Sequence, residues 1–221
     1  MKKNLSLLTT SKLFANITEP ELLSLSSQLD GHTRRLVKGE MLINEGDYYN
    51  YIGLVLTGEL CVTKVFTDGT QSHLEKLLPT YIIGADIACT PSKISPYTVF
   101  ATEDTSIWTL SYTYIEKPSV MPDPIRMQIT QNLLHFISNE NIRKLHKIEV
   151  LSKKRLRDRI LTYLIIQSKL KNNTTFEIPF NRNQLADYLC VNRSALSHEL
   201  SLMEKEGILT FHKNTFDLKI F

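Results

Sequence analysis

The sequence predicts an α+β protein made of an antiparallel β domain, one long helix and a small winged helical domain. Short β-like runs separated by single glycines fill the first half of the chain. A stretch without glycine or proline follows from Ile125 to about Leu151, and amphipathic helices with a closing hairpin pattern make up the rest. We place the three parts at residues 1–120, 121–151 and 152–221.

The composition excludes several classes of protein. Apolar residues make up 42% and charged residues 22% of the chain, which is typical of a globular protein. The longest apolar runs are far shorter than the roughly 18 residues of a membrane span, and the N-terminus lacks the apolar core of a signal peptide. Cys61, Cys89 and Cys190 are too widely separated to suggest a metal clip or a disulfide framework. We therefore expect a cytoplasmic protein with no membrane contact and no bound metal.

The first part alternates strands with tight turns. Glycine next to an acidic or polar residue indicates such turns, because a positive φ excludes most side chains. The turn segments are Lys38-Gly39-Glu40, Glu45-Gly46-Asp47, Thr57-Gly58-Glu59 and Asp68-Gly69-Thr70. The predicted strands are Met41–Ile43, Tyr51–Leu56, Leu60–Phe66, Leu74–Leu78 and Ile107–Leu110. A helix is expected before them, with Thr18 as N-cap, Pro20 in its first turn and Glu21 completing a capping box.

The long helix carries two apolar faces. One suits packing on the β domain and consists of Ile125, Ile129, Leu133 and Phe136. The other consists of Met127, Leu134, Ile137, Asn141, Leu145 and Ile148. Four of these, Met127, Leu134, Asn141 and Ile148, follow one another at intervals of seven residues. A heptad seam of this kind predicts a dimer interface whose register is fixed by the polar Asn141. The alternative is a single helix buried in the core of a monomer.

The third part is basic and contains two helices in close succession. Residues 149–221 carry 12 Lys/Arg against 8 Asp/Glu, whereas residues 1–148 carry 14 against 15, which indicates a polyanionic partner. After a helix that starts near Leu156, we expect helices at Asn183–Leu189 and Arg193–Glu206, joined by Cys190-Val191-Asn192. Gly207 should end the second helix, and a hairpin should follow around residues 212–215. This order predicts a winged helix-turn-helix, whose second helix enters the DNA major groove.

The N-terminus of that second helix supplies the candidate DNA contacts. Asn192 is expected to cap the helix. Its outer face then carries Arg193, Ser194, Ser197 and His198, and its core side carries Ala195, Leu196, Leu200 and Met203. Arginine can donate two hydrogen bonds to guanine, and histidine changes charge near neutral pH, so the DNA contact of His198 should depend on pH. Lys213 in the wing and the basic run 153–159 are candidates for phosphate contacts, with solvated surface charge as the alternative.

Together these parts resemble the CRP/FNR family of bacterial transcription regulators over nearly the whole chain. The resemblance is carried by Leu13-Phe14, Lys38-Gly39-Glu40, Glu45-Gly46-Asp47, Leu56-Thr57-Gly58-Glu59-Leu60, Asp68-Gly69-Thr70, Ile83-Gly84, Ala101-Thr102-Glu103, Gln184–Leu189 and Arg193–Ser197. It implies a cupin-like antiparallel β-roll (a double-stranded β-helix) as sensor, a dimerisation helix and a DNA-reading C-terminal domain. It also implies a homodimer on a double-stranded inverted-repeat operator, with RNA polymerase as a partner.

The sequence departs from the family at the positions that hold cofactors. Cyclic-nucleotide-binding members use Gly-Glu-Leu for the ribose and Arg-Ser for the phosphate, whereas this chain has Gly84-Ala85-Asp86-Ile87 and Pro96-Tyr97. The phosphate would lack its charged partner unless Lys93 substituted, so cAMP is not expected. Residues 1–60 contain no cysteine, which argues against an iron–sulfur cluster. Haem is not expected either, because the candidate axial ligands stand alone: His32, His73, His135 and His146.

What remains is a pocket of different character. Its predicted members are Gly84, Ala85, Asp86, Tyr97 and Thr98, with Asn141 reaching it across the dimer. Because Tyr97 replaces a small polar residue among apolar neighbours, we expect a less charged, aromatic effector. Three alternatives stay open: Tyr97 fills the pocket and no ligand is needed, Cys61 and Cys89 form a redox pair, or the dimer has lost specific DNA binding. An enzyme is not expected, since no catalytic motif is present and His32 and His73 do not form a metal-ligand cluster.

The recognition helix departs from the family as well. Members that read TGTGA-like half-sites carry Arg-Glu and a second Arg four residues after the Glu. Here Arg193 is kept, Ser194 replaces the Glu, and His198 replaces the second Arg. We therefore predict a guanine in each half-site and loose reading of the position that the Glu would contact.

Overall fold

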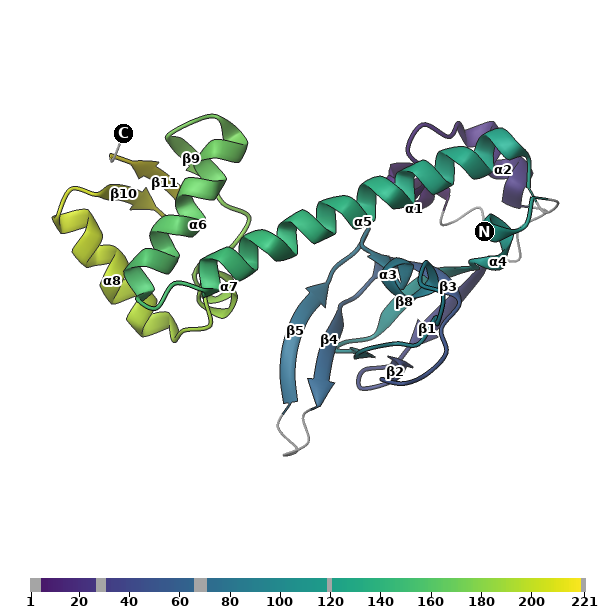
Figure 1. The fold of residues 1–221 in the computed structure, drawn as a ribbon, viewed down its shortest axis with the longest axis horizontal. Coiled ribbons are helices and arrows are strands. Elements are labelled where there is room, and N and C mark those ends of the chain that lie inside the picture. The colour runs from purple at the N-terminus through teal and green to yellow at the C-terminus, as the bar shows by residue number, and fades with distance from the viewer. Residues whose placement is uncertain (1–4, 27–30, 66–70, 119–120, 220–221) are drawn as a thin grey trace. The chain divides into compact units, whose positions relative to one another are not determined.

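The computed structural model describes residues 5–26, 31–65, 71–118 and 121–219. It divides into two compact units, Met1–Ser138 and Asn139–Phe221. The division falls inside helix α5 (Asp123–Leu151), which Figure 1 shows as one continuous coil. The boundaries predicted at residues 120 and 151 therefore lie near the ends of this helix and not at the division between the units.

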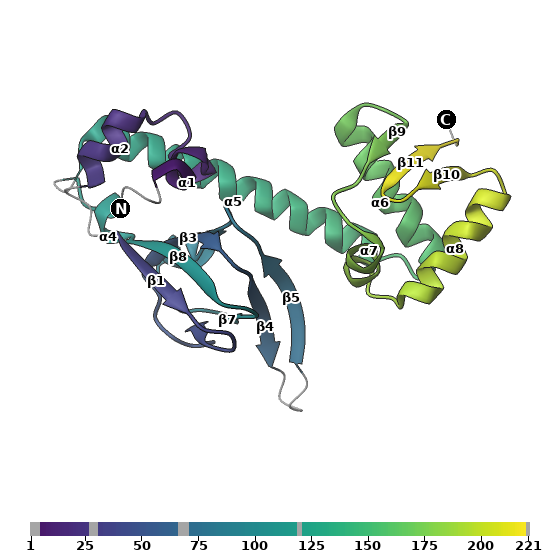
Figure 2. The same cartoon turned by 180° about the vertical axis from the view of Figure 1, so that it is seen from behind.

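The first unit is built on an antiparallel β-roll of two four-stranded sheets, with the orders β1-β8-β3-β6 and β2-β7-β4-β5. The strands are β1 (His32–Leu36), β2 (Met41–Ile43), β3 (Tyr51–Thr57), β4 (Leu60–Val65), β5 (Gln71–Leu77), β6 (Ile82–Ile83), β7 (Thr98–Ala101) and β8 (Thr105–Ser111). Figure 2 shows the paired strands β4 and β5 and the strands β1, β3 and β8 from the reverse side. The fold class implied by the resemblance is confirmed.

The glycine-punctuated pattern locates the strands well where they are apolar. Each of the five predicted strands forms, with ends shifted by up to three residues. Gly39, Gly46 and Gly58 have φ of 87°, 88° and 83° in the predicted turns, whereas Gly69 lies outside the described residues. The pattern does not indicate β1, β6 or β7. In β1, which reads His-Thr-Arg-Arg-Leu, every side chain except the last is exposed, so no apolar alternation marks it.

Two apolar cores hold the first unit together. One lies between the two sheets and includes Leu36, Val55, Leu60, Val62, Ile83, Val99 and Ile107. The other lies on the opposite face of the β1-β8-β3-β6 sheet, where Ile52, Leu54 and Trp108 pack against helical residues. Strand β3 thus contributes side chains to both cores, which explains why its apolar run is continuous.

Short helices cover this second core. They are α1 (Leu5–Thr10), the 3₁₀ helix η2 (Lys12–Phe14), α2 (Glu19–Ser26), α3 (Ala85–Ala88) and α4 (Thr113–Glu116). One half of the predicted capping box of α2 forms, because the Glu21 carboxylate accepts hydrogen bonds from the backbone N–H of Thr18 at 2.8 Å and from its hydroxyl at 2.7 Å. The Thr18 hydroxyl is thus a donor to this carboxylate, whereas the box would have it accept the N–H of Glu21. These bonds lower the pKa of Glu21. Both views place α1 and α2 beside the first half of α5 (Figures 1 and 2).

The predicted core face of α5 is confirmed. Ile129 and Leu133 are fully buried against the first unit, and Ile125 and Phe136 are partly buried there. The buried Asn132 adds a polar attachment that the pattern does not reveal. Its side-chain amide donates to the carbonyls of Leu13 and Ala15, both at 2.9 Å, and so ties α5 to the end of η2.

The second unit is a winged helical domain around one apolar core. Its elements are α6 (Leu156–Lys171), β9 (Thr175–Glu177), α7 (Arg182–Tyr188), α8 (Arg193–Lys205), β10 (Leu209–His212) and β11 (Thr215–Leu218). The strands form an antiparallel sheet in the order β10-β11-β9. The core joins Val150 at the end of α5 with Leu164, Leu189 and Leu200. Among the described residues, none of the helices is both long and apolar enough to cross a membrane.

Candidate nucleic-acid interface and effector pocket

Helices α7 and α8 form the predicted helix-turn-helix. An Asn181–Gln184 capping box starts α7, and the N–H of Val191 closes its end by bonding to the carbonyl of Ala186 at 3.0 Å. Cys190 occupies the left-handed position of this turn, with φ of 54°, where glycine is more common. Helix α8 begins at Arg193, three residues after Cys190, and Gly207, with φ of 74°, ends it as predicted.

The core side of α8 is confirmed at three positions and wrong at one. Leu196, Leu200 and Met203 are completely buried. Ala195 is exposed, because it precedes Leu196 by one residue and one residue rotates a helix by about 100°. It therefore lies on the flank of α8 and not on its buried stripe.

The outer side of α8 presents the predicted contact residues. Asn192, Arg193, Ser194 and His198 are exposed, and Ser197 is partly buried. Asn192 occupies the N-cap position, but its side chain makes no capping hydrogen bond. The expected capping role is therefore wrong for the side chain, which is left available to an outside partner. Lys213 is exposed at the tip of the wing, with a φ of 54°.

Arg182 is a cation that the motif does not single out. Its guanidinium lies 4.9 Å from the ring centre of Phe211 and 5.8 Å from that of Phe216, and it donates to the carbonyl of Lys213 at 3.3 Å. Burial and the nearby charge of Arg193 lower its pKa. The first turn of α7 therefore supports the wing and adds positive charge beside Arg193. A sequence signal does exist, because arginine is placed in the first helical turn, where acidic residues are usual.

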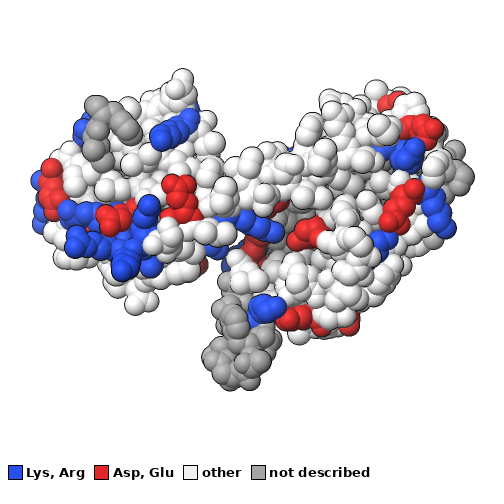
Figure 3. All heavy atoms as spheres, viewed as in Figure 1, with Lys and Arg blue, Asp and Glu red and all other residues white. Residues whose placement is uncertain are grey.

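The basic run before and within α6 divides into two groups. Lys153, Lys154 and Arg155 are exposed. Arg157 and Arg159 are instead bonded within the unit, since Arg159 donates to the carbonyls of Lys153 and Leu189 at 2.9 and 3.2 Å. On the face seen in Figure 3, Lys and Arg atoms gather where Figure 1 draws α8 and the start of α6. The possible phosphate contact of Arg159 is thus replaced by a structural role.

The second apolar face of α5 is exposed in the single chain. Met127, Leu134, Leu145 and Ile148 are each 61–64% exposed. Together with the exposed Gln131, Ser138 and Asn141, they recur at alternating spacings of four and three residues, as in a coiled-coil seam. Ile137 is different, because it is partly buried against the core of the first unit. Ile142, which is 51% exposed, lies beside this stripe.

The predicted effector residues of the first unit are partly brought together. Gly84, with φ of 75°, caps α3, and a side chain there would collide with Tyr49. Ala85 is buried in α3, and the exposed Asp86 accepts a hydrogen bond from the Tyr97 hydroxyl at 2.7 Å. Burial, and then Asp86, raise the pKa of Tyr97.

Two other predicted members lie elsewhere. Thr98 precedes the buried Val99 on β7, so its side chain lies on the opposite face of the strand, and its hydroxyl accepts the N–H of Glu45 at 3.1 Å. Asn141 belongs to the second unit. Glu75 is an unpredicted neighbour, since it pairs across the sheet with Val62 and adds to the negative potential at Tyr97.

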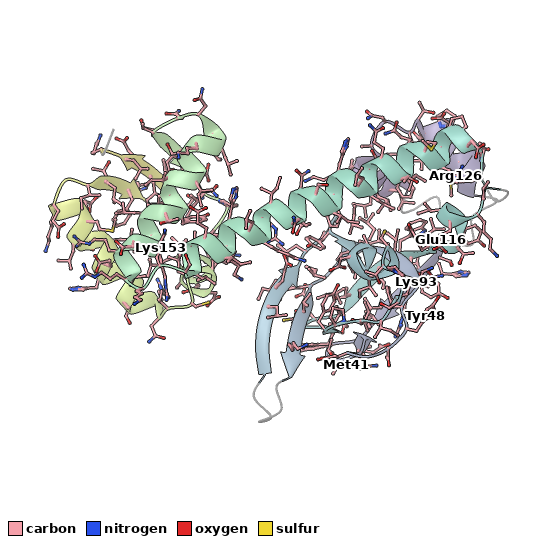
Figure 4. All side chains as sticks on the ribbon, viewed as in Figure 1. Met41, Tyr48, Lys93, Glu116, Arg126 and Lys153 are labelled. Atoms are coloured by element: carbon pink, nitrogen blue, oxygen red, sulfur yellow. The ribbon has the colours of Figure 1, made fainter. Side chains whose placement is uncertain are left out.

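The remaining candidate ligands are engaged or separated. The Lys93 ammonium donates to both carboxylate oxygens of Glu116, at 2.8 and 3.0 Å, and Figure 4 shows the two labelled residues together. Lys93 is therefore not free to replace the phosphate-binding arginine. Cys61 is buried and Cys89 is exposed, both are free thiols, and burial is the main cause that raises the pKa of each. Within the described part of the chain, no three His, Cys, Asp or Glu side chains come together as a metal site.

Both units of the chain are similar to domains of known proteins. A cyclic nucleotide-binding domain model matches residues 33–117, and a Crp-like helix-turn-helix domain model matches residues 154–220. The transcriptional activator protein FnrA of Stutzerimonas stutzeri is 27% identical over 182 residues, which are 80% of this chain and 72% of that protein.

Solved structures agree on the fold. The structure of FixK2 from Bradyrhizobium japonicum matches with a TM-score of 0.55 at 21% identity, and the match covers 86% of this chain and 93% of the FixK2 chain. The structure of the catabolite activator protein of Thermus thermophilus matches with a TM-score of 0.53 at 20% identity, and the match covers 95% of this chain and 94% of that protein's chain. Two domain models in the family's order, on the family's fold, leave one conclusion: the chain belongs to the CRP/FNR family, whose members are transcription regulators with a helix-turn-helix DNA-binding domain and not enzymes.

Proposed function

We propose that the protein is a homodimer that binds an inverted-repeat operator through the N-termini of its two α8 helices. The carrying observation is the exposed set Arg193, Ser194 and His198, whose side chains no hydrogen bond or ion pair engages within the described residues. Arginine at this place can donate two hydrogen bonds to guanine. Two-fold symmetry places the half-sites about one helical turn apart, roughly 34–36 Å.

The exposed stripe of α5 supports the dimer. Four apolar side chains more than 60% exposed on one helix face are costly for a monomer, because each leaves apolar surface in water. A second copy of the same helix would cover them, with Asn141 opposite its counterpart to set the register. RNA polymerase is the further partner that the name of the FnrA relative, a transcriptional activator, supports.

Regulation is proposed to depend on a small molecule other than cAMP in the β-roll. The residues Pro96 and Tyr97 in place of the phosphate-binding pair, and the commitment of Lys93 to Glu116, support the exclusion of cAMP. The Tyr97–Asp86 hydrogen bond favours a second candidate, a regulator that needs no effector, because the two side chains already satisfy each other. Calorimetric titration with cAMP and with uncharged aromatic compounds separates the two: heat from an aromatic compound supports an effector, and its absence across the series supports the closed pocket.

Selection of bound duplexes from a random DNA library tests the DNA-binding proposal. The wild-type protein at moderate salt without added ligand should enrich an inverted repeat with a guanine in each half-site. Binding without enrichment, lost steeply as salt rises, would contradict sequence-specific reading, because it would report phosphate contacts alone.

A further inference from the structure

We infer that Arg157 is a positioning residue that sets the rotation of the recognition helix, and with it the discrimination between operator sequences. Arg157 lies in the first turn of α6, directly after the segment that follows α5. Its Nε donates to Glu199 at 2.6 Å, and its two terminal nitrogens donate to Glu206 at 2.6 and 3.0 Å. One guanidinium thus binds two carboxylates of α8 and its C-cap. This inference rests on the proposed function, since discrimination presupposes sequence-specific binding.

The spacing of the two carboxylates explains why the contact fixes rotation. Glu199 and Glu206 are seven residues apart, which is about two helical turns, so both lie on the same flank of α8. The apolar contacts of Leu196, Leu200 and Met203 hold α8 to the core but allow small rotations about its axis, whereas a bidentate guanidinium has a fixed planar geometry. Turning α8 would stretch the hydrogen bonds to both glutamates together.

The contact is partly sheltered from water. The exposed fractions of the side chains are 33% for Arg157, 19% for Glu199 and 46% for Glu206. The bonds to Glu206 and Glu199 also raise the pKa of Arg157. A paired, partly buried arginine of this kind is poorly placed to bind a DNA phosphate.

The first turn of α6, which contains Arg157, also contacts the other helix of the helix-turn-helix. Two residues later, Arg159 binds the carbonyl of Lys153, before α6, and that of Leu189, at the end of α7. The first turn of α6 therefore grips both helices of the helix-turn-helix, α7 through Arg159 and α8 through Arg157. A displacement of this turn would be passed directly to the recognition helix.

The test is the Arg157→Met variant, which keeps most of the side-chain length but removes the charge and the donors. We expect the ratio of affinities for the selected operator and for the same duplex with the half-site guanines replaced to fall about three- to tenfold, the effect of losing charge-assisted hydrogen bonds that are partly screened. The slope of log K against log salt should not change, because no phosphate contact is lost. The Arg157→Lys variant should restore part of the ratio.

Arg155→Met is the matched control. Arg155 belongs to the same basic run but is exposed, and as N-cap of α6 it makes no side-chain capping bond. Its ratio of affinities should equal that of the wild type even if Arg155 contacts a phosphate, because a lost phosphate contact weakens binding to both duplexes alike. An equal loss of discrimination in both variants, or a changed salt slope with an unchanged ratio in Arg157→Met, would overturn the inference in favour of general charge or phosphate contact.

Two further measurements keep the inference falsifiable on its own. Glu206→Gln removes half of the clamp at a largely exposed helix end, and its effect combined with Arg157→Met should be less than additive if the residues act together. Hydrogen exchange of the α8 amides in the DNA-free protein should be faster in Arg157→Met than in the wild type. Unchanged exchange would overturn the role of Arg157 in holding α8, whether or not the wild type selects an operator. A wild type that selects no operator would, by itself, count against the proposed function only.

Discussion

The candidate sites of the two units differ in what their side chains do inside the protein. In the second unit, Arg193, Ser194 and His198 are exposed at the start of α8, and no hydrogen bond or ion pair within the described residues holds their side chains. In the first unit, Tyr97 and Asp86 are bonded to each other. Polar groups that stabilise no internal contact are available to an outside partner, whereas a satisfied pair contributes to folding. From this contrast we expect the exposed side chains of the second unit to contact DNA, and the Tyr97–Asp86 pair of the first unit to have a structural role.

The largest expected effect comes from the seam that would join two recognition surfaces. Leu145→Glu places a charge on the exposed stripe of α5, where Leu145 is 61% exposed in the single chain. The variant should remain folded but become monomeric, and its affinity for a two-half-site operator should fall about 100-fold or more, because the second half-site no longer binds intramolecularly. Sedimentation velocity and DNA titration measure the two effects.

Leu170→Glu is the matched control for the seam, since Leu170 is 65% exposed on α6. It should remain dimeric and bind normally. A dimeric Leu145→Glu protein with normal affinity would show that the second copy does not use this stripe.

A smaller effect is expected at the wing. Lys213→Gln should weaken binding to all duplexes about fivefold at moderate salt and reduce the salt slope by about one, because one phosphate contact is removed. Lys171→Gln, at the exposed C-terminal end of α6, should change neither quantity. A loss confined to one operator sequence would mean that Lys213 contacts a base, which would extend the recognition surface beyond α8.

In the first unit, a substitution at the candidate site should change the stability of the protein and leave its DNA binding unchanged. Tyr97→Phe removes the hydroxyl that bonds to Asp86 and should lower the free energy of unfolding by about 0.5–1.5 kcal/mol. Urea unfolding followed by the fluorescence of Trp108, the chain's one tryptophan and a core residue of this unit, measures the change. Operator preference should stay that of the wild type. A change in DNA affinity without a change in stability would break the comparison, since it would make Tyr97 a regulatory contact.

The smallest effect concerns alkaline pH. Burial and then Asp86 raise the pKa of Tyr97 in the folded state, so the folded protein retains this proton where the unfolded chain loses it. Stability should therefore fall as pH rises through the unfolded tyrosine pKa of about 10. The Tyr97→Phe protein should lose less stability between pH 9 and 11 than the wild type, in buffers of about equal ionic strength. Parallel curves would show that Tyr97 ionises as easily in the folded state.

Local signals in the sequence locate much of this fold. Turn glycines such as Gly46, the Thr18–Glu21 contact and the end of α8 at Gly207 depend on a few neighbouring residues, and the structure contains them all. The two faces of α5 follow from spacing, so Ile129 and Leu134 fall on the buried and exposed sides that the pattern predicts.

The contacts that spacing cannot predict are those between distant segments. Asn132 bonds to Leu13 and Ala15 across more than a hundred residues, and Arg157 binds carboxylates that follow it by 42 and 49 positions. A basic run therefore looks uniform in the sequence, although Arg155 is exposed while Arg157 and Arg159 are bonded. Likewise, Thr98 stands next to Tyr97 in sequence but bonds to Glu45 on the other face of its strand. Composition and the spacing of apolar residues predict a helix or strand, whereas the partner of a long polar side chain depends on tertiary packing.

The most direct test of recognition by α8 is a parallel library selection with the wild type and Arg193→Ala. Arg193 is exposed, so its removal should not unfold the protein. The wild type should enrich an inverted repeat with one guanine in each half-site, and the variant should bind the same repeat with that guanine no longer preferred, a loss of about 10- to 100-fold in discrimination. If both proteins enrich the same sequence with the same preference, α8 does not read the operator through Arg193 and the account is wrong.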